Sequence, residues 1–260
     1  MSEPGSLPEY LSASSISTFQ QCPQKFKLSR VDKHSEPPTH HTLLGNFVHE
    51  VLERMYADYP GEGRTFEQAK LLLRSIWDSG LWEEKVTPYL PRDISAKDFR
   101  RLAYWCVKNL FEMENPSEIE PDGVEHELSG DIDGVVMKGF IDRWSRVNLN
   151  TARITDYKTG KIPNPRFKSK DDMFFQLILY AALLEKETGL DTFELELLYI
   201  KDGTRLTHSP TRAEIEAVKE TIVTVRKEIE NCYANDDWKP QTSKLCDWCI
   251  FKRELCTYWN

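Results

Sequence analysis

Residues 172–188 are predicted to form a helix that is apolar on every side, and this helix limits the folds that the chain can adopt. Its centre, from Leu177 to Leu184, holds one tyrosine, Tyr180, among aliphatic side chains. A helix that is apolar around its whole circumference is stable in water only when other elements cover more than one of its sides. The apolar run is too short to cross a bilayer, so the sequence favours a layered, water-soluble fold with this helix inside.

Helices are predicted before residue 121, and mainly strands from there to residue 208. Ser14 or Ser15 is expected to cap a first helix, and an apolar stripe that includes Leu44 and Met55 marks a second. Further helices are predicted at 66–77 and 96–114 and from a cap at Thr211 to about residue 233, and strands at 123–128, 135–147, 152–158, 193–201 and 205–208. Helices combined with a mostly antiparallel sheet indicate a layered α/β domain with a helical N-terminal lobe.

The charge of the chain limits how it can bind nucleic acid. The 260 residues include 42 acidic and 34 basic side chains, a formal net charge of -8. The surface as a whole is therefore not of the uniformly basic kind that coats duplex DNA, and any nucleic-acid contact must be local. The first residues lack the basic and apolar regions of an export signal, which predicts a cytoplasmic protein.

Four of the six cysteines have a spacing that suggests a metal or cluster. Cys246, Cys249 and Cys256 lie within eleven residues, and Cys22 can supply a fourth thiolate from the other end of the chain. In a reducing compartment such cysteines favour metal ligation or simple burial over disulfides. Four thiolates can hold zinc or an iron–sulfur cluster, and the spacing does not distinguish the two.

Asp142 and Asp156 are predicted to face each other across a β-hairpin. If the hairpin turns around Leu149, the residue numbers of each pair across it add to 298. Asp142 and Asp156 then lie directly opposite each other, with Cβ atoms about 5 Å apart. Lys158 shares the face of Asp156 because strand side chains alternate. Two facing carboxylates repel each other, so the arrangement favours a bound divalent cation, and Mg²⁺ suits a ligand set this sparse.

Lys158 would then lie beside a metal-bound phosphate, where its charge stabilises the transition state or orients an attacking water. The alternative is an ordinary solvated hairpin, in which Asp142 pairs with Arg143 or Arg146 and Asp156 pairs with Lys158. A register shift of one residue would also place the two aspartates on opposite faces of the sheet.

A basic segment surrounds the second aspartate. Between Arg153 and Lys170 there are six basic residues and one acid. On a chain of net negative charge this contrast predicts a track for a phosphate backbone, with a solvated charged loop as the alternative. Phe167, Phe174 and Phe175 lie nearby and could stack on unpaired bases, although core packing explains the last two equally well.

Several ordered motifs resemble those of RecB-like nucleases in the PD-(D/E)XK superfamily. Two of them are Gly139-x-x-Asp142-Arg143 and Asp156-Tyr157-Lys158-Thr159-Gly160-Lys161, and it is the joint occurrence of the motifs in order that is specific, since each alone is weak. The others are an N-terminal element from Leu11 to Cys22-Pro23, a helical motif Leu44-Gly45-x-x-Val48-His49, a Gln176-x-x-x-Tyr180 motif and the trailing cysteines. The motifs span residues 11–256, and the chain is most similar to iron–sulfur members, such as the AddB-type helicase–nucleases and the CRISPR-adaptation nucleases.

The resemblance implies one nuclease domain with a restriction-endonuclease-like core, in which a mixed sheet is flanked by helices. Residues 11–121 would form the helical N-terminal lobe, 122–210 the catalytic sheet and helix, and 211–260 the last helix and the cysteine cluster.

It also implies roles for single residues. The catalytic residues would be His49, Asp142, Asp156, Lys158, Gln176 and Tyr180. Mg²⁺ or Mn²⁺ would be bound by His49, Asp142, Asp156 and the carbonyl of Tyr157. A [4Fe-4S] cluster, with zinc as the alternative, would be held by Cys22, Cys246, Cys249 and Cys256. The basic residues expected to contact DNA are Arg143, Lys161, Arg166 and Lys168.

The expected activity is metal-dependent hydrolysis of phosphodiester bonds by a DNA exonuclease. Single-stranded DNA or DNA ends would be the substrate, in repair, recombination, or phage or CRISPR DNA processing. The expected partner is a helicase or a CRISPR or recombination complex. The sequence has no P-loop motif and therefore no such motor of its own. The alternative is a non-catalytic DNA-end-binding or assembly subunit built on a nuclease fold.

Overall fold

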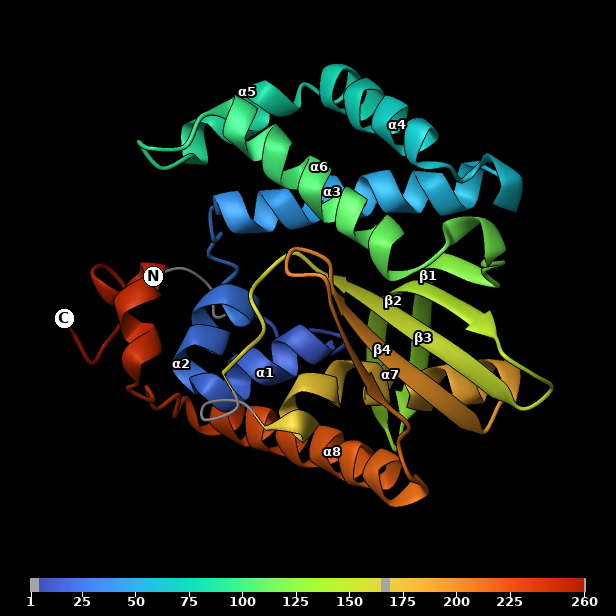
Figure 1. The fold of residues 1–260 in the computed structure, drawn as a ribbon. Helices are drawn as coiled ribbons and strands as arrows, with labels where there is room; N and C mark the ends of the chain where they lie inside the picture. The colour runs from blue at the N-terminus through green and yellow to red at the C-terminus, as the bar shows by residue number, and fades with distance from the viewer. Residues whose placement is uncertain (1–4, 165–168, 260) are drawn as a thin grey trace.

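The protein is a five-stranded mixed sheet with helices on both sides, seen in Figure 1. The computed structural model describes residues 5–164 and 169–259. In sheet order the strands are β1 (Gly123–Ile132), β2 (Val135–Arg146), β3 (Thr151–Lys158), β4 (Thr192–Tyr199) and β5 (Thr204–His208). β3 and β4 are parallel, and all other neighbours are antiparallel. The predicted α/β class, with a mixed sheet flanked by helices, is confirmed.

The helices predicted from the sequence are present. They are α1 (Ala13–Gln21), α3 (His40–Asp58), α4 (Phe66–Ser79), α6 (Ala96–Met113), α7 (Lys170–Thr188) and α8 (Arg212–Asn235), and the structure adds two short helices that were not predicted, α2 (Pro23–Phe26) and α5 (Trp82–Val86). α8 begins after its predicted cap, since the Thr211 side chain accepts a hydrogen bond from the Glu214 N–H. The cap of α1 is Ser12 rather than Ser14 or Ser15, because the Ser12 hydroxyl accepts the Ser15 N–H.

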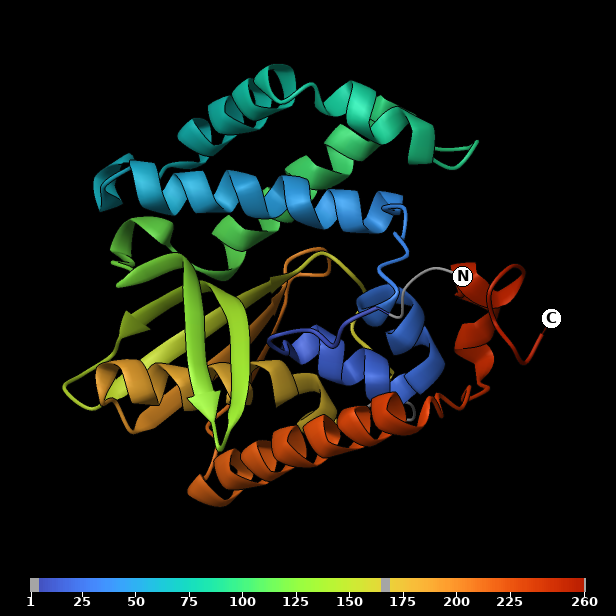
Figure 2. The ribbon, with the colours of Figure 1, turned by 180° about the vertical axis from the view of Figure 1, so that it is seen from behind.

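α7 is enclosed, as its apolar circumference predicts. It connects β3 to β4 and packs on one face of the sheet, with α1 and α8 against its other sides (Figures 1 and 2). Residues 177–184 are buried in a core that also contains inward side chains of β1 to β4 and of α8. Among the described helices, none has both the length and the apolar character needed to span a membrane.

Helices α3 to α6 form a lobe over the opposite face of the sheet, shown above the strands in Figure 1. The lobe has a core of its own, built around side chains such as Phe47, Val51 and Ile76. Tyr157 of β3 and Leu198 of β4 reach up into that core. The sheet therefore carries helices on both faces, and α3 is held close to the end of β3.

β2 and β3 pair along only part of their lengths. Their ladder runs from Arg146↔Ala152 to Arg143↔Thr155, which is the predicted register with paired numbers adding to 298. Beyond this point β3 continues beside β4, whereas β2 runs back to Val135 with Leu11 bridged to its free edge. The two strands separate where Asp142 begins the unpaired part of β2. The resulting fork is the setting of the candidate site.

Gly139 of β2 allows Tyr180 of α7 to lie directly against the strand. A Cβ atom at position 139 would overlap the ring atoms of Tyr180. The glycine that opens the Gly-x-x-Asp-Arg motif therefore serves the packing of the sheet on α7, three residues before Asp142.

We expect Gly139→Ala to lower the free energy of unfolding by about 1–3 kcal/mol, because the ring and the strand are both fixed in the core. Gly160→Ala is the matched control, since a Cβ there meets no described atom within 4 Å. Urea denaturation of the two variants measures the difference. Equal stabilities would show that the Tyr180 ring gives way at no cost.

Candidate active site

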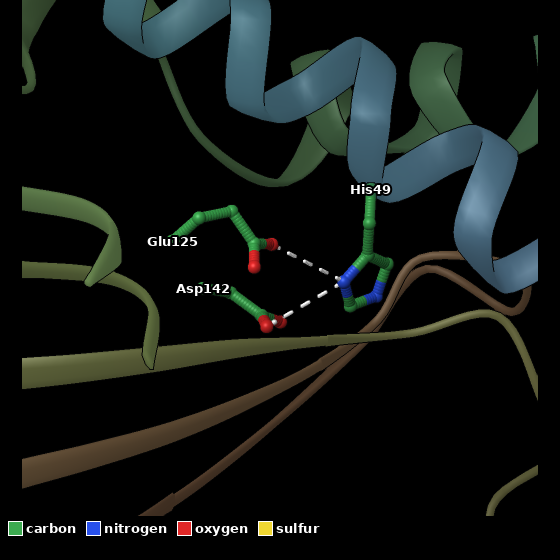
Figure 3. Close-up of side chains that lie close together, drawn as sticks. All are labelled: His49, Glu125 and Asp142. Carbon is green, nitrogen blue, oxygen red and sulfur yellow. Dashed lines mark ion pairs between the residues drawn. The ribbon is translucent and has the colours of Figure 1, made fainter. Parts of the chain in front are cut away.

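The carboxylate of Asp142 is fixed in the fork between β2 and β3. Its Oδ2 accepts a hydrogen bond of 2.7 Å from the backbone N–H of Tyr157. Its Oδ1 lies 3.5 Å from Nδ1 of His49, which projects from α3 (Figure 3). The Asp142 side chain is 11% exposed, so the backbone positions it while one edge stays accessible.

His49 reaches from the lobe to the end of β3. Its Nε2–H donates a hydrogen bond of 2.9 Å to the carbonyl of Tyr157, which leaves Nδ1 facing the carboxylates of Asp142 and Glu125. Burial alone would lower the pKa of this imidazole. The nearby carboxylates of Asp142 and Glu125 outweigh burial and raise the pKa of His49 to about 11. The protonated ring therefore neutralises part of the carboxylate charge around it.

Glu125 is the third member of this group and is not among the metal ligands predicted from the sequence. Its Oε1 lies 3.8 Å from Nδ1 of His49 (Figure 3). The β1–β2 register places Glu125 across from Asp142, between the pairs Val124↔Arg143 and His126↔Ile141. Its φ of 44° is in the left-handed region, which costs a residue with a Cβ about 1 kcal/mol or more. The strand therefore carries local strain at the residue that turns its carboxylate toward His49.

A sequence signal for Glu125 exists in the pair Asp133-Gly134. Both residues have positive φ, 49° and 90°, as a type I′ hairpin turn requires, and Asp-Gly is typical of that turn. With a two-residue turn at Asp133-Gly134, the residue numbers of each pair across the hairpin add to 267. Glu125 is therefore opposite Asp142. The pairing rule that sets Asp156 opposite Asp142 across the β2–β3 hairpin therefore sets Glu125 opposite Asp142 across the β1–β2 hairpin.

Asp156 and Lys158 form an ion pair beside this group. Lys158 Nζ lies 2.6 Å from Asp156 Oδ2, and Asp156 is 5% exposed. Burial raises the pKa of Asp156 to about 6; Lys158 opposes this shift and the charge of Asp142 adds to it. Burial would lower the pKa of Lys158, but the carboxylate of Asp156 raises it. The pairing of Asp156 with Lys158 matches the alternative interpretation of the hairpin, whereas Asp142 pairs with His49 rather than with an arginine.

Gln176 and Tyr180 lie on the α7 side of the same carboxylates. Gln176 Nε2 donates to the Tyr180 hydroxyl at 3.1 Å, so the two side chains share one face of the helix, as their spacing predicts. Burial raises the pKa of Tyr180, and the charges of Asp156 and Asp142 raise it further. Tyr180 therefore remains a neutral hydroxyl close to the acidic group.

A cavity of about 590 Å³ opens beside the site. Residues of α3 from His41 to Glu53 line one side, and Lys158 to Gly160, at the end of β3, line the other. Both Glu125 and His49 belong to the lining, so a molecule in this cleft reaches the candidate ligands directly.

The donor atoms suit a divalent cation. One atom each from His49, Glu125 and Asp142 lies within 4.8 Å of the others, and in the described part of the chain no second group of this kind is found. Carboxylate oxygens and an imidazole nitrogen are ligands that Mn²⁺ and related ions accept. Of the predicted metal ligands, His49 and Asp142 belong to this group. Asp156 lies beside it, and the Tyr157 carbonyl accepts from His49.

The prediction that Arg143 contacts DNA was wrong. Arg143 is 3% exposed, and its guanidinium donates two hydrogen bonds, of 2.6 and 2.9 Å, to Glu114 at the end of α6. The hydroxyl of Tyr56 donates to the same carboxylate, and the guanidinium lies 4.7 Å from the centre of the Tyr56 ring. A buried arginine needs such a partner, and this one ties β2 to the lobe instead of facing solvent.

The other residues predicted to bind nucleic acid are placed differently. Lys161 is exposed just after β3, whereas Arg166, Lys168 and Phe167 lie outside the described residues. Arg153 pairs with Glu194 of β4 at 2.6 Å and is therefore not a free charge for phosphate. Core packing is the role that the structure gives to Phe174, and Phe175 packs against the same core.

The four predicted cluster cysteines line one cavity of about 180 Å³ between the N-terminal helices and the C-terminal segment. None of the four forms a disulfide within the described residues, and the thiols are not close enough together there to form a preassembled ligand group. The Cys256 thiol donates to Gln24 Oε1 at 3.6 Å, and Cys246 Sγ accepts from the Ser243 N–H at 3.4 Å. The two ends of the chain thus meet at these cysteines, as predicted, with the thiols apart.

Comparison with known sequences identifies one family. The sequence model of the PD-(D/E)XK nuclease superfamily matches residues 10–256, a range that contains every residue of the site. The Gene 69 protein of Mycobacterium phage D29 is 29% identical over 201 residues, which cover 69% of this chain and 70% of that protein. The Gene 69 protein of Mycobacterium phage L5 is 27% identical over 208 residues, which cover 65% of this chain and 68% of that protein.

A solved structure has a similar fold. The crystal structure of a candidate exonuclease from Eubacterium rectale superimposes with a TM-score of 0.60, covering 95% of this chain and 90% of that one. The sequence identity is 14%, so this likeness concerns the fold alone.

The raised pKa of His49 predicts how stability depends on pH in the metal-free protein. A pKa raised from 6.5 to about 11 gives a stabilising contribution that is complete below pH 6.5 and is lost as the pH rises through about 11. In EDTA, the stability advantage of the wild type over His49→Gln should therefore shrink steadily over that range. The glutamine keeps a donor for the Tyr157 carbonyl but cannot titrate. Urea denaturation at a series of pH values measures this difference, and a constant difference would contradict the assignment.

Proposed function

The chain belongs to the PD-(D/E)XK nuclease superfamily, and from this premise we propose that it is a Mg²⁺- or Mn²⁺-dependent deoxyribonuclease that works as an exonuclease on single-stranded DNA or DNA ends. Nuclease activity follows from the family, and the metal, the substrate and the exonuclease mode are the proposal. The observation that carries it is the convergence of His49, Glu125 and Asp142 from three separate elements, beside an open cleft that His49 and Glu125 line.

These three side chains would hold the cation, with Asp156 as a further carboxylate beside them. A bound divalent ion supplies Lewis-acid stabilisation of a phosphate and lowers the pKa of a bound water. Nδ1 of His49 can bind a metal only after losing its proton, so cation binding and deprotonation of His49 are coupled. The strong repulsion among these carboxylates is the reason that a cation fits here.

Residues of the chain position the metal ligands and supply a positive charge. The backbone of Tyr157 fixes Asp142 through its N–H and His49 through its carbonyl, so both side chains are in place before a substrate arrives. Lys158 lines the cleft, and Asp156 keeps its amine protonated. A fixed positive charge at this position stabilises the negative charge that develops on a phosphate during hydrolysis.

The exonuclease mode has indirect support. The structural relative named above is a candidate exonuclease, and its fold covers nearly the whole of this chain. The cleft lies between α3 and the end of β3, a geometry that suits the end of a strand entering between two walls.

We expect Asp142→Asn to reduce cleavage of end-labelled single-stranded DNA by at least about a hundredfold, because it removes a charged ligand without changing side-chain size. Asp191→Asn, at an exposed carboxylate before β4, is the control and should cleave as the wild type does. Rates are measured in Mn²⁺ and in EDTA on linear and circular strands. Cleavage of circular strands at the linear rate would contradict an exonuclease, and undiminished cleavage by Asp142→Asn would remove this site from the reaction.

We further propose that Cys22, Cys246, Cys249 and Cys256 hold a [4Fe-4S] cluster that joins the two ends of the chain. Supporting this is the cavity that the four thiols share. Binding would require the four thiols to come closer together, because they lie apart in the structure.

Anaerobically purified protein should then be brown and contain about four iron and four sulfide ions per chain. Cys249→Ser should lose both iron and colour, whereas Cys106→Ser, at a cysteine buried in the lobe core, should keep the iron of the wild type. Colourless protein that carries zinc would overturn the cluster in favour of the alternative metal.

A further inference from the structure

β2 carries an exposed row of side chains that leads directly to Asp142. Val136, Lys138, Phe140 and Asp142 alternate along the strand and therefore share one face. The residues between them point the other way, since Met137 and Ile141 are buried in the core around α7. Phe140, the neighbour of Asp142 in this row, is 52% exposed, which is unusual for a phenylalanine in a strand that packs on the core.

Tyr10 extends the row. Leu11 is bridged to Met137 and buried, so the preceding residue, Tyr10, lies on the outward face and is 45% exposed. The ammonium of Lys138 lies 4.9 Å from the centre of the Tyr10 ring. In Figure 2 the β1–β2 hairpin lies in front of α7, and below α3 none of the described helices crosses its outward face. Two aromatic rings and an amine are thus open to solvent on the active-site face of β2.

We propose that this face, formed by Phe140, Lys138 and Tyr10, is a stacking platform for the unpaired bases of the strand whose phosphate lies at Asp142. The proposal rests on the nuclease function proposed above. Two residues along a strand span about 7 Å, so Phe140 is placed to stack on the base next to the scissile phosphate. Lys138 would contact the phosphate backbone of the nucleic-acid strand one nucleotide further along, and Tyr10 would stack on a second base.

The chemistry of the platform favours a single strand over a duplex. An aromatic side chain stacks on a base only when that base is free of its neighbour in a helix, as in single-stranded binding sites. The opposing strand adds a second reason, because Glu127 lies across from Phe140 and Asp131 across from Val136, and both are exposed. These carboxylates repel a second phosphate backbone on the β1 side.

A strand of nucleic acid is the occupant that fits the position of the platform better than a protein does. The row is continuous with Asp142, so whatever covers it also reaches the candidate active site. A protein surface seated there would lie across Asp142 and impede access to it. A strand that passes through the site uses the platform and the carboxylates together.

The test is binding of a short single strand that contains a fluorescent adenine analogue whose emission falls on stacking, measured in EDTA so that no cleavage occurs. Phe140→Ala should weaken binding by roughly tenfold and restore the emission of the analogue, as expected for the loss of one stacked base. Phe140→Trp should keep both the affinity and the quenching, because a larger ring stacks at least as well. Leu149→Ala, at a fully solvated apolar side chain in the β2–β3 turn, is the matched control and should behave as the wild type.

Unchanged affinity and quenching in Phe140→Ala would overturn the platform. An equal loss of affinity for a blunt duplex would also overturn it, because stacking requires unpaired bases. If Phe140→Ala changed only the oligomeric state, measured by sedimentation in the same samples, the face would be a contact between copies of the chain and the proposal would fail. Cleavage by the wild type is scored separately, so failure of the nuclease proposal and failure of the platform are distinguishable.

Discussion

The backbone of one residue, Tyr157, organises the candidate site. Its N–H holds the carboxylate of Asp142 from β2, and its carbonyl accepts from His49 of α3. Its side chain is buried in the core of the lobe, while its backbone pairs with Leu198 in the sheet. Tyr157 therefore joins α3, β2 and β4 at this point. Backbone groups in a paired strand move little, so the two side chains they hold are fixed as well.

A buried cluster of charges keeps the lobe at the right distance for this arrangement. Arg143 and Tyr56 both bond to Glu114, and Arg205 of β5 bonds to Glu196 of β4 beneath them. Burying such charges costs free energy, and only complete pairing offsets it, so the lobe can dock on the sheet in few ways. Tyr56 and His49 lie two turns apart on α3 and therefore face the same side. The charged cluster that holds Tyr56 in place therefore also orients His49 toward Asp142.

The candidate site places several negative charges close together, and the platform leaves aromatic side chains exposed to water. Both features cost free energy of folding. Glu125 adopts a strained backbone conformation to face Asp142, and only the proton on His49 offsets this charge within the group of three. Phe140 leaves much of a large ring in water one step away. Such local costs are typical of residues that bind something, and a cation together with a nucleic-acid strand would relieve both.

The sequence by itself determined the elements and one register. Apolar periodicity identified the helices, the Asn148-Leu149-Asn150 loop fixed the pairing of β2 with β3, and the unbroken apolar face of α7 required a layered fold. These are local patterns whose physical cause lies within a few neighbouring residues. The second register, set by Asp133-Gly134, was equally readable and contains Glu125.

Only the tertiary structure decided which charges meet. Arg143 belongs to the Gly-x-x-Asp-Arg motif and was predicted to contact DNA. In the structure it is buried in an ion pair with Glu114, which lies 29 positions away in sequence. His49 is brought to Asp142 by the docking of a lobe, and Tyr10 reaches Lys138 through a single bridge at Leu11. Interactions between charges and rings depend on distance in space, and a fold brings together residues whose separation along the chain carries no such information.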